Sequence, residues 1–249
     1  MRSIFDKIQR KLLHLRLRPI RVFCFHEVSE TDENSPDWVP ISFFKEQIME
    51  YKNAGYEFIT LAEAHRHISK DIFRRHKYAL LTADDGLRCQ LELLPWLQEQ
   101  NIPVTLSLNV KSLKQKECGA PYREWYHIQD PSTEKRYAEK LYISEKELSE
   151  LQLDNVSVAL HGVDHDKAAT DVTIEEFEQD VIECLKVFSK NKHYTPFYVY
   201  KYGKHNNITD ELLKKYGLTP VLSDGEKNYN DSNVVHREIL ETIYRKICQ

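Results

Sequence analysis

The chain has 249 residues, of which 41% are hydrophobic and 11% aromatic, enough to bury a sizeable core and too apolar for a disordered chain. Its formal charge of −4 excludes the strong positive charge expected of a dedicated nucleic-acid binder. No run of about 18 apolar residues and no signal-peptide core is present, and five widely spaced cysteines favour reduced thiols over a disulfide framework. We therefore expect a cytoplasmic protein.

The first residues differ in composition from the rest. Residues 1–19 are basic, and Ile4, Ile8, Leu12 and Leu15 recur at helical spacing. We expect an N-terminal helix over 1–19 and one domain over 20–249. The shortness of the segment favours a helix that docks on the domain. The alternative is peripheral contact with an anionic inner membrane surface.

From residue 20 onward, strand and helix patterns alternate. The run from Ile20 to Phe25 predicts a first strand that ends at His26. Ser42 and Thr209 are each expected to N-cap a helix. Capping-box spacing predicts helix starts at Thr60 with Glu63, Ser144 with Glu147, and Thr173 with Glu176. Further strands are predicted over 57–59, 78–81, 104–108, 156–160, 197–200 and 218–222, and a further helix over 89–99. This alternation predicts a parallel α/β sheet or barrel with helices outside.

The stretch from 110 to 145 is the least regular. It is rich in charge and aromatic residues, namely Tyr122, Trp125, Tyr126, Tyr137 and Tyr142. Aromatic faces of this kind stack on sugar rings, but they also serve as ordinary packing residues. Both interpretations stay open.

Two adjacent carboxylates, Asp84 and Asp85, follow the buried strand at 78–81 and precede Gly86. Like charges at short range oppose each other's ionisation, so a bound cation or a role in proton transfer would justify the pair. In α/β folds ligands gather where strands end. The alternative is an ordinary Asp-Asp-Gly turn.

A second polar group ends the strand at 156–160. His161 and His165 are spaced four residues apart, so one helical turn would place both imidazoles on the same side. Neutral imidazole is a common zinc ligand, and open catalytic sites use three protein ligands. Two histidines with one carboxylate from Asp84 or Asp85 would complete such a set. By itself the histidine pair is a weak signal in a chain with 11 histidines.

Together these segments resemble the NodB-homology polysaccharide deacetylases, carbohydrate esterase family 4, over residues 20–240. Residues 82–86 read Thr-Ala-Asp-Asp-Gly, where the family has Thr-Phe-Asp-Asp-Gly. Residues 161–165 read His-Gly-Val-Asp-His, where the family has His-Ser/Thr-x-x-His. Further similar segments are 25–28, 44–47, 55–61, 94–95 and 102–105. The resemblance implies a distorted barrel of about seven strands, the (β/α)7-type fold.

The resemblance also implies site roles. Asp85, His161 and His165 would bind one divalent metal, most simply zinc, with cobalt, nickel or iron as alternatives. Asp84 would be the general base that takes the proton of the attacking water. The backbone N–H of Tyr202, in the Tyr-Lys-Tyr-Gly segment 200–203, would help hold the oxyanion. The substrate would be an N-acetylated sugar of a polysaccharide or glycan precursor.

The chain departs from the family pattern at several positions. Gly162 replaces the usual Ser or Thr, and Lys201 stands where Pro is usual. The third-motif Arg that orients the base has no match, and Arg237 is a candidate replacement. The late histidine that serves as general acid is also missing, and His26 and His236 are the candidates to protonate the leaving amine.

Two alternatives to a deacetylase remain at this point. One is a carbohydrate-binding protein on a decayed deacetylase fold, favoured by the altered third motif and opposed by the intact Asp84, Asp85, His161 and His165. The other is a different metal-dependent amide or ester hydrolase, since one fold hosts many chemistries.

Overall fold

The computed structural model describes residues 19–30, 35–69, 76–228 and 234–248. The predicted helix over 1–19 lies almost wholly outside these residues, and its two possible roles stay predictions. Within the described residues, no helix is both long and apolar enough to cross a membrane. Cys24, Cys89, Cys118 and Cys184 are free thiols.

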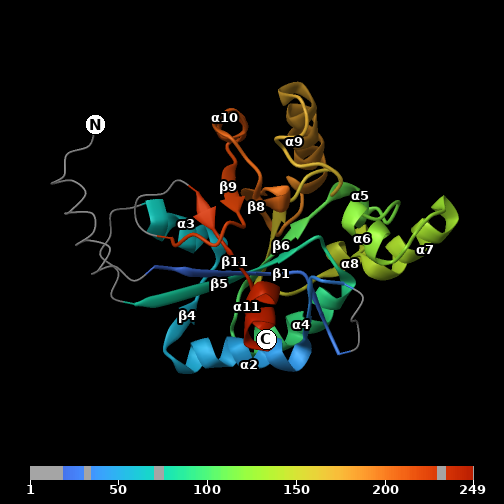
Figure 1. Ribbon diagram of the computed structural model, residues 1–249. Helices are drawn as coiled ribbons and strands as arrows, with labels where there is room; N and C mark the ends of the chain where they lie inside the picture. Colours follow the sequence, from blue (N-terminus) through green and yellow to red (C-terminus); the bar gives the residue numbers. More distant parts are fainter. Residues whose placement is uncertain (1–18, 31–34, 70–75, 229–233, 249) are drawn as a thin grey trace.

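A parallel sheet forms the centre of the molecule (Figure 1). Its strands pair in the order β10-β9-β8-β7-β6-β5-β1-β11, and β4 also pairs with β5. The strand bounds are β1 Arg21–Phe25, β4 Tyr56–Phe58, β5 Lys77–Asp84, β6 Val104–Leu108, β7 Val156–Leu160, β8 Tyr194–Val199, β9 Thr219–Leu222, β10 Val235–His236 and β11 Glu238–Ile239. A separate parallel pair joins β2, Glu27–Ser29, to β3, Trp38–Pro40.

One short segment closes the sheet. β10 pairs with β9 at one edge, and β11 pairs with β1 at the other. Only Arg237 separates β10 from β11, so residues 235–239 join both edges. If β10 and β11 are taken as one interrupted strand, seven strands of the described chain form a nearly closed barrel. This confirms the predicted (β/α)7-type barrel.

Helices cover the barrel (Figure 1). Their bounds are α2 Ile41–Asn53, α3 Leu61–Ser69, α4 Arg88–Glu99, α5 Val110–Leu113, α6 Ala120–Trp125, α7 Pro131–Leu141, α8 Glu145–Glu150, α9 Ile174–Phe188, α10 Asn207–Lys215 and α11 Leu240–Cys248, with a 3₁₀ turn η1 at Lys201–Gly203. Figure 1 shows α5, α6, α7 and α8 gathered on one side of the barrel. The irregular stretch 110–145 therefore holds three short helices.

Three of the predictions about helix starts are confirmed and two are wrong. The three capping boxes at Thr60, Ser144 and Thr173 are confirmed. The N-cap prediction for Ser42 is wrong, because α2 begins at Ile41 after Pro40. The prediction for Thr209 is also wrong: Asn206 caps α10, and its side chain accepts the N–H groups of Ile208 and Thr209. Asn is among the strongest N-cap residues, and it lies three positions earlier.

Side-chain alternation along the strands separates two cores. Phe23, Phe25, Leu81 and Ala83 belong to a core shared with residues of α2, α4 and α9, outside the barrel. Val22 and Leu80 belong to a second core with residues of β8, β9 and α3. Positions on the same side of β1 and β5 as Val22 and Leu80 therefore face the barrel interior. That side carries Cys24, Thr82 and Asp84.

Candidate active site

The site lies where two strands of the barrel end. β5 ends at Asp84, and β7 ends just before His161. Because parallel strands end at one edge of the sheet, both groups meet there. After Asp84 the chain turns sharply: Asp85 has φ 71° and Gly86 has φ 69°. The left-handed conformation of Asp85 is rare for a residue with a side chain and concentrates at functional sites.

Asp85, His161 and His165 form the first cluster of the site. Asp85 Oδ1 lies 3.3 Å from Nε2 of His161 and 3.3 Å from Nε2 of His165. All three side chains are buried, and their ligand atoms lie within 4.8 Å of one another. Burial lowers the pKa of His165 to about 4, and Asp85 only partly opposes that shift. His165 is therefore a neutral imidazole at neutral pH, the form that binds metals.

The donor pattern of this cluster fits a cation. His161 Nδ1 lies 2.8 Å from the carbonyl oxygen of Val199, which favours a proton on Nδ1 and leaves a lone pair on Nε2. That lone pair faces Asp85 Oδ1, and neither atom has a hydrogen-bond partner among the described residues. With the proton on Nδ1, two buried acceptors face each other. A divalent metal would satisfy both, and these residue types suit zinc.

The loop from 161 to 165, here called the histidine loop, is not helical, so the predicted helical turn is wrong. Backbone N–H groups of Val110 and Lys111 donate to the carbonyl oxygens of Gly162 and Val163. The buried Asn109 side chain donates to the carbonyl oxygens of His161 and Asp164. These contacts, rather than helix geometry, bring the two imidazoles together.

Tyr122 of α6 holds the other oxygen of Asp85. Its hydroxyl donates to Asp85 Oδ2 at 2.6 Å, and both side chains are buried. Burial and the nearby Asp85 charge raise the pKa of Tyr122, so the hydroxyl stays a donor. Asp85 thus keeps only Oδ1 for the two histidines. Tyr122 is therefore neither exposed for sugar stacking nor simple packing.

Asp84 lies beside this cluster in a different environment. Arg237 donates to both of its carboxylate oxygens, from Nη1 to Oδ1 and from Nη2 to Oδ2, each at 2.7 Å. Arg237 also donates to Thr82 Oγ1 and Ser223 Oγ, and its side chain is fully buried. Burial would raise the pKa of Asp84, but the charge and hydrogen bonds of Arg237 outweigh it and lower that pKa. Arg237 reaches Asp84 because it lies between β10 and β11, where the barrel closes.

His26, just after β1, faces the same space and is held by Glu241. The backbone N–H of His26 donates to Glu241 Oε1 at 2.7 Å, and its Nδ1 lies 3.3 Å from the same oxygen. Burial lowers the pKa of His26, but Glu241, and less strongly Asp85 and Asp84, raise it to about 10. His26 is thus protonated at neutral pH, with Glu241 on its Nδ1 side.

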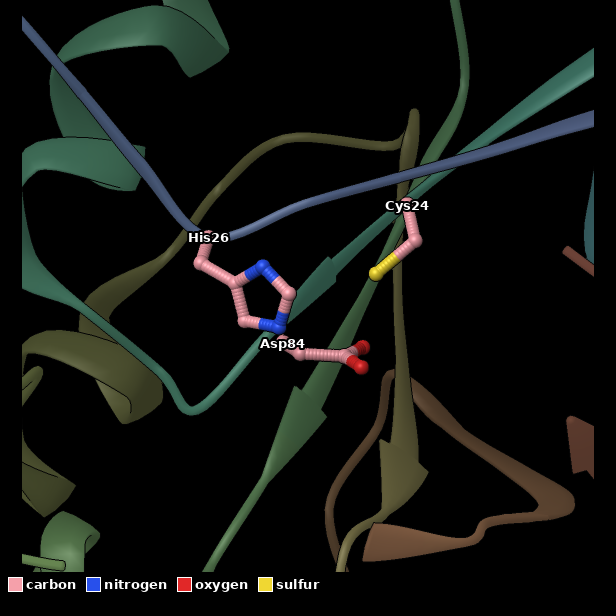
Figure 2. A group of neighbouring side chains, drawn as sticks. All are labelled: Cys24, His26 and Asp84. Carbon is pink, nitrogen blue, oxygen red and sulfur yellow. The ribbon is translucent and has the colours of Figure 1, made fainter. Parts of the chain in front are cut away.

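Cys24, His26 and Asp84 form a second group whose possible ligand atoms lie within 4.8 Å of one another (Figure 2). This group suits a metal poorly. Both Asp84 oxygens already accept hydrogen bonds from a guanidinium. Burial raises the pKa of the Cys24 thiol well above its ordinary value. His26 is protonated, so a cation would meet a positive charge rather than a lone pair.

Of the two remaining predicted site residues, Tyr202 lies at the site and His236 does not. Tyr202 lies in η1 with φ 57°, and its hydroxyl donates to the carbonyl oxygen of His165 at 2.9 Å. Its ring packs edge-on against His165. His236 does not join the site. Its Nδ1 lies 2.8 Å from Asp224 Oδ2, and because it precedes Arg237 in an extended segment it points the other way.

One cavity of about 340 Å³ lies at the site. Its lining comprises His26, Asp37, Asp84, Asp85, Pro121, Trp125, His161, His165, Tyr200, Tyr202, Ser223 and Ile239. Trp125 and Tyr202 bring aromatic rings to it, whereas His236 is not part of the lining.

Sequence reasoning missed Glu241 and Asn109 and gave Tyr122 no role at the carboxylates. Glu241 is 215 positions from His26, and no local pattern marks it. Glu241 is fully buried at the start of α11, and its distance from His26 in the chain hides the contact. Asn109 follows a strand end, which is the one signal that could have drawn attention to it.

Comparison with known proteins agrees with this geometry. The family model for polysaccharide deacetylases matches residues 73–221, more than half of the chain. No curated protein gives a significant sequence match. Among solved structures, IcaB from Ammonifex degensii matches with 20% identity and a TM-score of 0.69, over 89% of this chain and 91% of that chain. The deacetylase PplD from Streptococcus pyogenes, in complex with acetate, matches with 15% identity and a TM-score of 0.69, over 89% and 92%. A de-N-acetylase from Aggregatibacter actinomycetemcomitans matches with 15% identity and a TM-score of 0.69, over 88% and 93%.

The fold and the site thus define a barrel hydrolase that acts on carbon–nitrogen bonds other than peptide bonds. The chain belongs to the polysaccharide deacetylase family. Membership supports deacetylase activity and implies a carbohydrate substrate. The Asp85, His161 and His165 cluster is its candidate site for a divalent metal.

Proposed function

We propose that this protein is a metal-dependent deacetylase that removes the acetyl group from an N-acetylated sugar of a polysaccharide or glycan precursor. The observation that carries the proposal is the position of Asp85 Oδ1, which is buried without a hydrogen-bond partner among the described residues and lies 3.3 Å from His161 Nε2. His165 adds the third ligand. The His₂Asp set favours zinc, and cobalt, nickel or iron would also fit.

When bound, a divalent metal lowers the pKa of a coordinated water and polarises the acetyl carbonyl. Asp84 is the general base. Arg237 keeps it ionised at neutral pH, and each of its oxygens still has a further lone pair that can accept a proton. The same guanidinium fixes the direction of the carboxylate, which matters because a misplaced base loses much of its effect.

His26 is the general acid. It lines the cavity, it is protonated, and Glu241 orients its ring from the Nδ1 side. Its Nε2–H can therefore be donated to the leaving amine. His236, the other candidate, lies outside the cavity lining and does not serve this role.

Substrate positioning falls to the rim of the cavity. The backbone N–H of Tyr202 helps hold the developing oxyanion. The rings of Trp125 and Tyr202 offer flat faces to a sugar, and about 340 Å³ accommodates one monosaccharide with its acetamido group. Acetate, which is bound in the structure of the neighbour PplD, would be the small product here.

The test is acetate release from a panel of N-acetylhexosamine oligomers and nucleotide- or lipid-linked sugars. Chelator-treated protein would be assayed with and without added zinc or cobalt. We expect release that depends on added metal. Bound metal without release across the panel would favour another amide or ester hydrolase, and failure of both binding and release would favour a carbohydrate-binding protein.

A further inference from the structure

A buried lysine lies behind the histidine loop. Lys201, the first residue of η1 and the neighbour of Tyr202, is only 5% exposed. Its Nζ lies 3.7 Å from Asp180 Oδ1 and 3.8 Å from Asp164 Oδ1. Asp180 belongs to α9, and Asp164 belongs to the histidine loop. One ammonium thus lies between η1, α9 and the loop that carries His161 and His165.

Asp180 connects this ammonium to the backbone of the loop. Its Oδ2 accepts the N–H of Val163, which lies between the two histidines in the chain. Its Oδ1 accepts the hydroxyl of Tyr198 of β8 at 3.0 Å. The Asp180 side chain is 16% exposed, and a carboxylate that has lost most of its water is stabilised by a nearby positive charge, which Lys201 supplies.

Lys201 packs closely against the histidine loop at Gly162. A Cβ atom at Gly162 would lie 2.9 Å from Lys201 Nζ and 3.1 Å from Asp180 Oδ1, and Gly162 has φ +89°. The ammonium therefore occupies the space that a side chain at position 162 would need. The two departures from the family pattern, Gly162 and Lys201, are therefore neighbours in the structure.

We propose that Lys201 is a positioning residue that holds the histidine loop, through Asp180 and Asp164, so that both imidazoles face Asp85. The same side chain joins this loop to the turn that carries Tyr202. This inference rests on the proposed metal centre. Asn109 and the backbone of residues 110–111 hold the loop from the β6 side, and Lys201 with Asp180 holds it from the opposite side.

The test compares zinc affinity and the visible absorption spectrum of the cobalt-substituted protein in wild type, Lys201→Met and Lys201→Arg. Groups behind metal ligands commonly contribute about 10- to 100-fold to metal affinity, so we expect a loss of that size in Lys201→Met. The cobalt spectrum should change as well, because ligand geometry changes. Lys201→Arg should recover much of the affinity, since it keeps the charge and borders a cavity of about 350 Å³.

Lys204→Met is the matched control. Lys204 lies just after the same turn, pairs with Asp171 at 3.5 Å, and its side chain is 57% exposed. It should leave zinc affinity and the cobalt spectrum unchanged. If Lys201→Met does not fold, Lys201→Met with Asp180→Asn removes both charges together and should still show weaker zinc binding.

The outcomes separate the two claims. Wild-type zinc affinity and an unchanged cobalt spectrum in the folded Lys201 variants would overturn the role of Lys201 alone. A wild-type chain that binds no zinc would overturn the proposed metal centre and this inference with it. Weakened binding in Lys201→Met with recovery in Lys201→Arg would support both.

Discussion

Asp84 and Asp85 are neighbours in the chain, but the structure gives their carboxylates opposite surroundings. Both oxygens of Asp84 accept hydrogen bonds from one buried guanidinium. Asp85 has a tyrosine hydroxyl on one oxygen, and its other oxygen faces two imidazoles without a hydrogen-bond partner. A buried carboxylate that a guanidinium compensates stays ionised, whereas a buried carboxylate oxygen without a partner can be satisfied by a cation. These surroundings support the proposed roles, with Asp84 in proton transfer and Asp85 in metal binding.

The largest effect is expected from a substitution of Asp84. Asp84→Asn should lower kcat for acetate release by about 10²- to 10⁴-fold, because the amide cannot serve as general base. Zinc affinity should stay close to wild type, since the proposed ligands are Asp85, His161 and His165. The variant also leaves Arg237 without its carboxylate, which costs on the order of 3–5 kcal/mol of stability, so thermal unfolding must be checked. Near-normal turnover would reject Asp84 as the base.

The next largest effect is expected from a substitution in the cluster of Asp85, His161 and His165. His165→Ala should lower zinc affinity by more than about 100-fold, because it removes a ligand rather than a group behind one. His236→Ala is the matched control, since this histidine pairs with Asp224 away from the cavity. Zinc titration by competition with a chelating dye measures both. Full retention of zinc in His165→Ala would remove this residue from the ligand set.

A smaller effect is expected when Asp85 loses its hydrogen bond from Tyr122. Tyr122→Phe removes the hydroxyl that donates to Asp85 Oδ2 and keeps the ring. We expect about tenfold weaker zinc binding, because Asp85 Oδ2 loses its donor. This oxygen is then left unsatisfied or turns toward the metal, and either change disturbs the position of Oδ1. The cobalt spectrum should shift with the coordination. Equal affinity and an equal spectrum in wild type and variant would show that Tyr122 only packs.

The smallest change concerns pH. Glu241 raises the pKa of His26 to about 10, so the acid form is present below that pH and is lost as pH rises through it. Glu241→Gln removes the carboxylate, and burial then lowers the pKa of His26. The alkaline limb of kcat/KM should therefore move to lower pH by about one unit or more. Glu238→Gln, which affects the Arg21 pair instead, is the control. An unmoved limb would argue against His26 as the acid.

Much of the fold could be predicted because its signals are local. Strand runs, helix stripes and capping boxes depend on residues a few positions apart, and all three predicted capping boxes are confirmed. The positions of Asp85 and His161, just after two strands, follow from the rule that ligands gather where parallel strands end. The same local reasoning wrongly predicted a helical turn for His161 and His165. The contacts that bring the two imidazoles together come from Asn109 and its neighbours, which lie far away in the chain.

The rest of the site depends on how the barrel closes. Arg237 reaches Asp84, 153 positions away, only because residues 235–239 join the two edges of the sheet. Glu241 reaches His26 through the helix that follows. His236 and Arg237 are adjacent in sequence and point to opposite sides, a distinction that needs the strand direction. No pattern within a short window carries this information.

The most direct test of the central comparison is anomalous scattering at the zinc absorption edge from crystals of the wild-type protein soaked in zinc. We expect one strong peak among Asp85 Oδ1, His161 Nε2 and His165 Nε2, with Arg237 still bound to both oxygens of Asp84. A peak among Cys24, His26 and Asp84 instead, or no peak at either cluster, would contradict it.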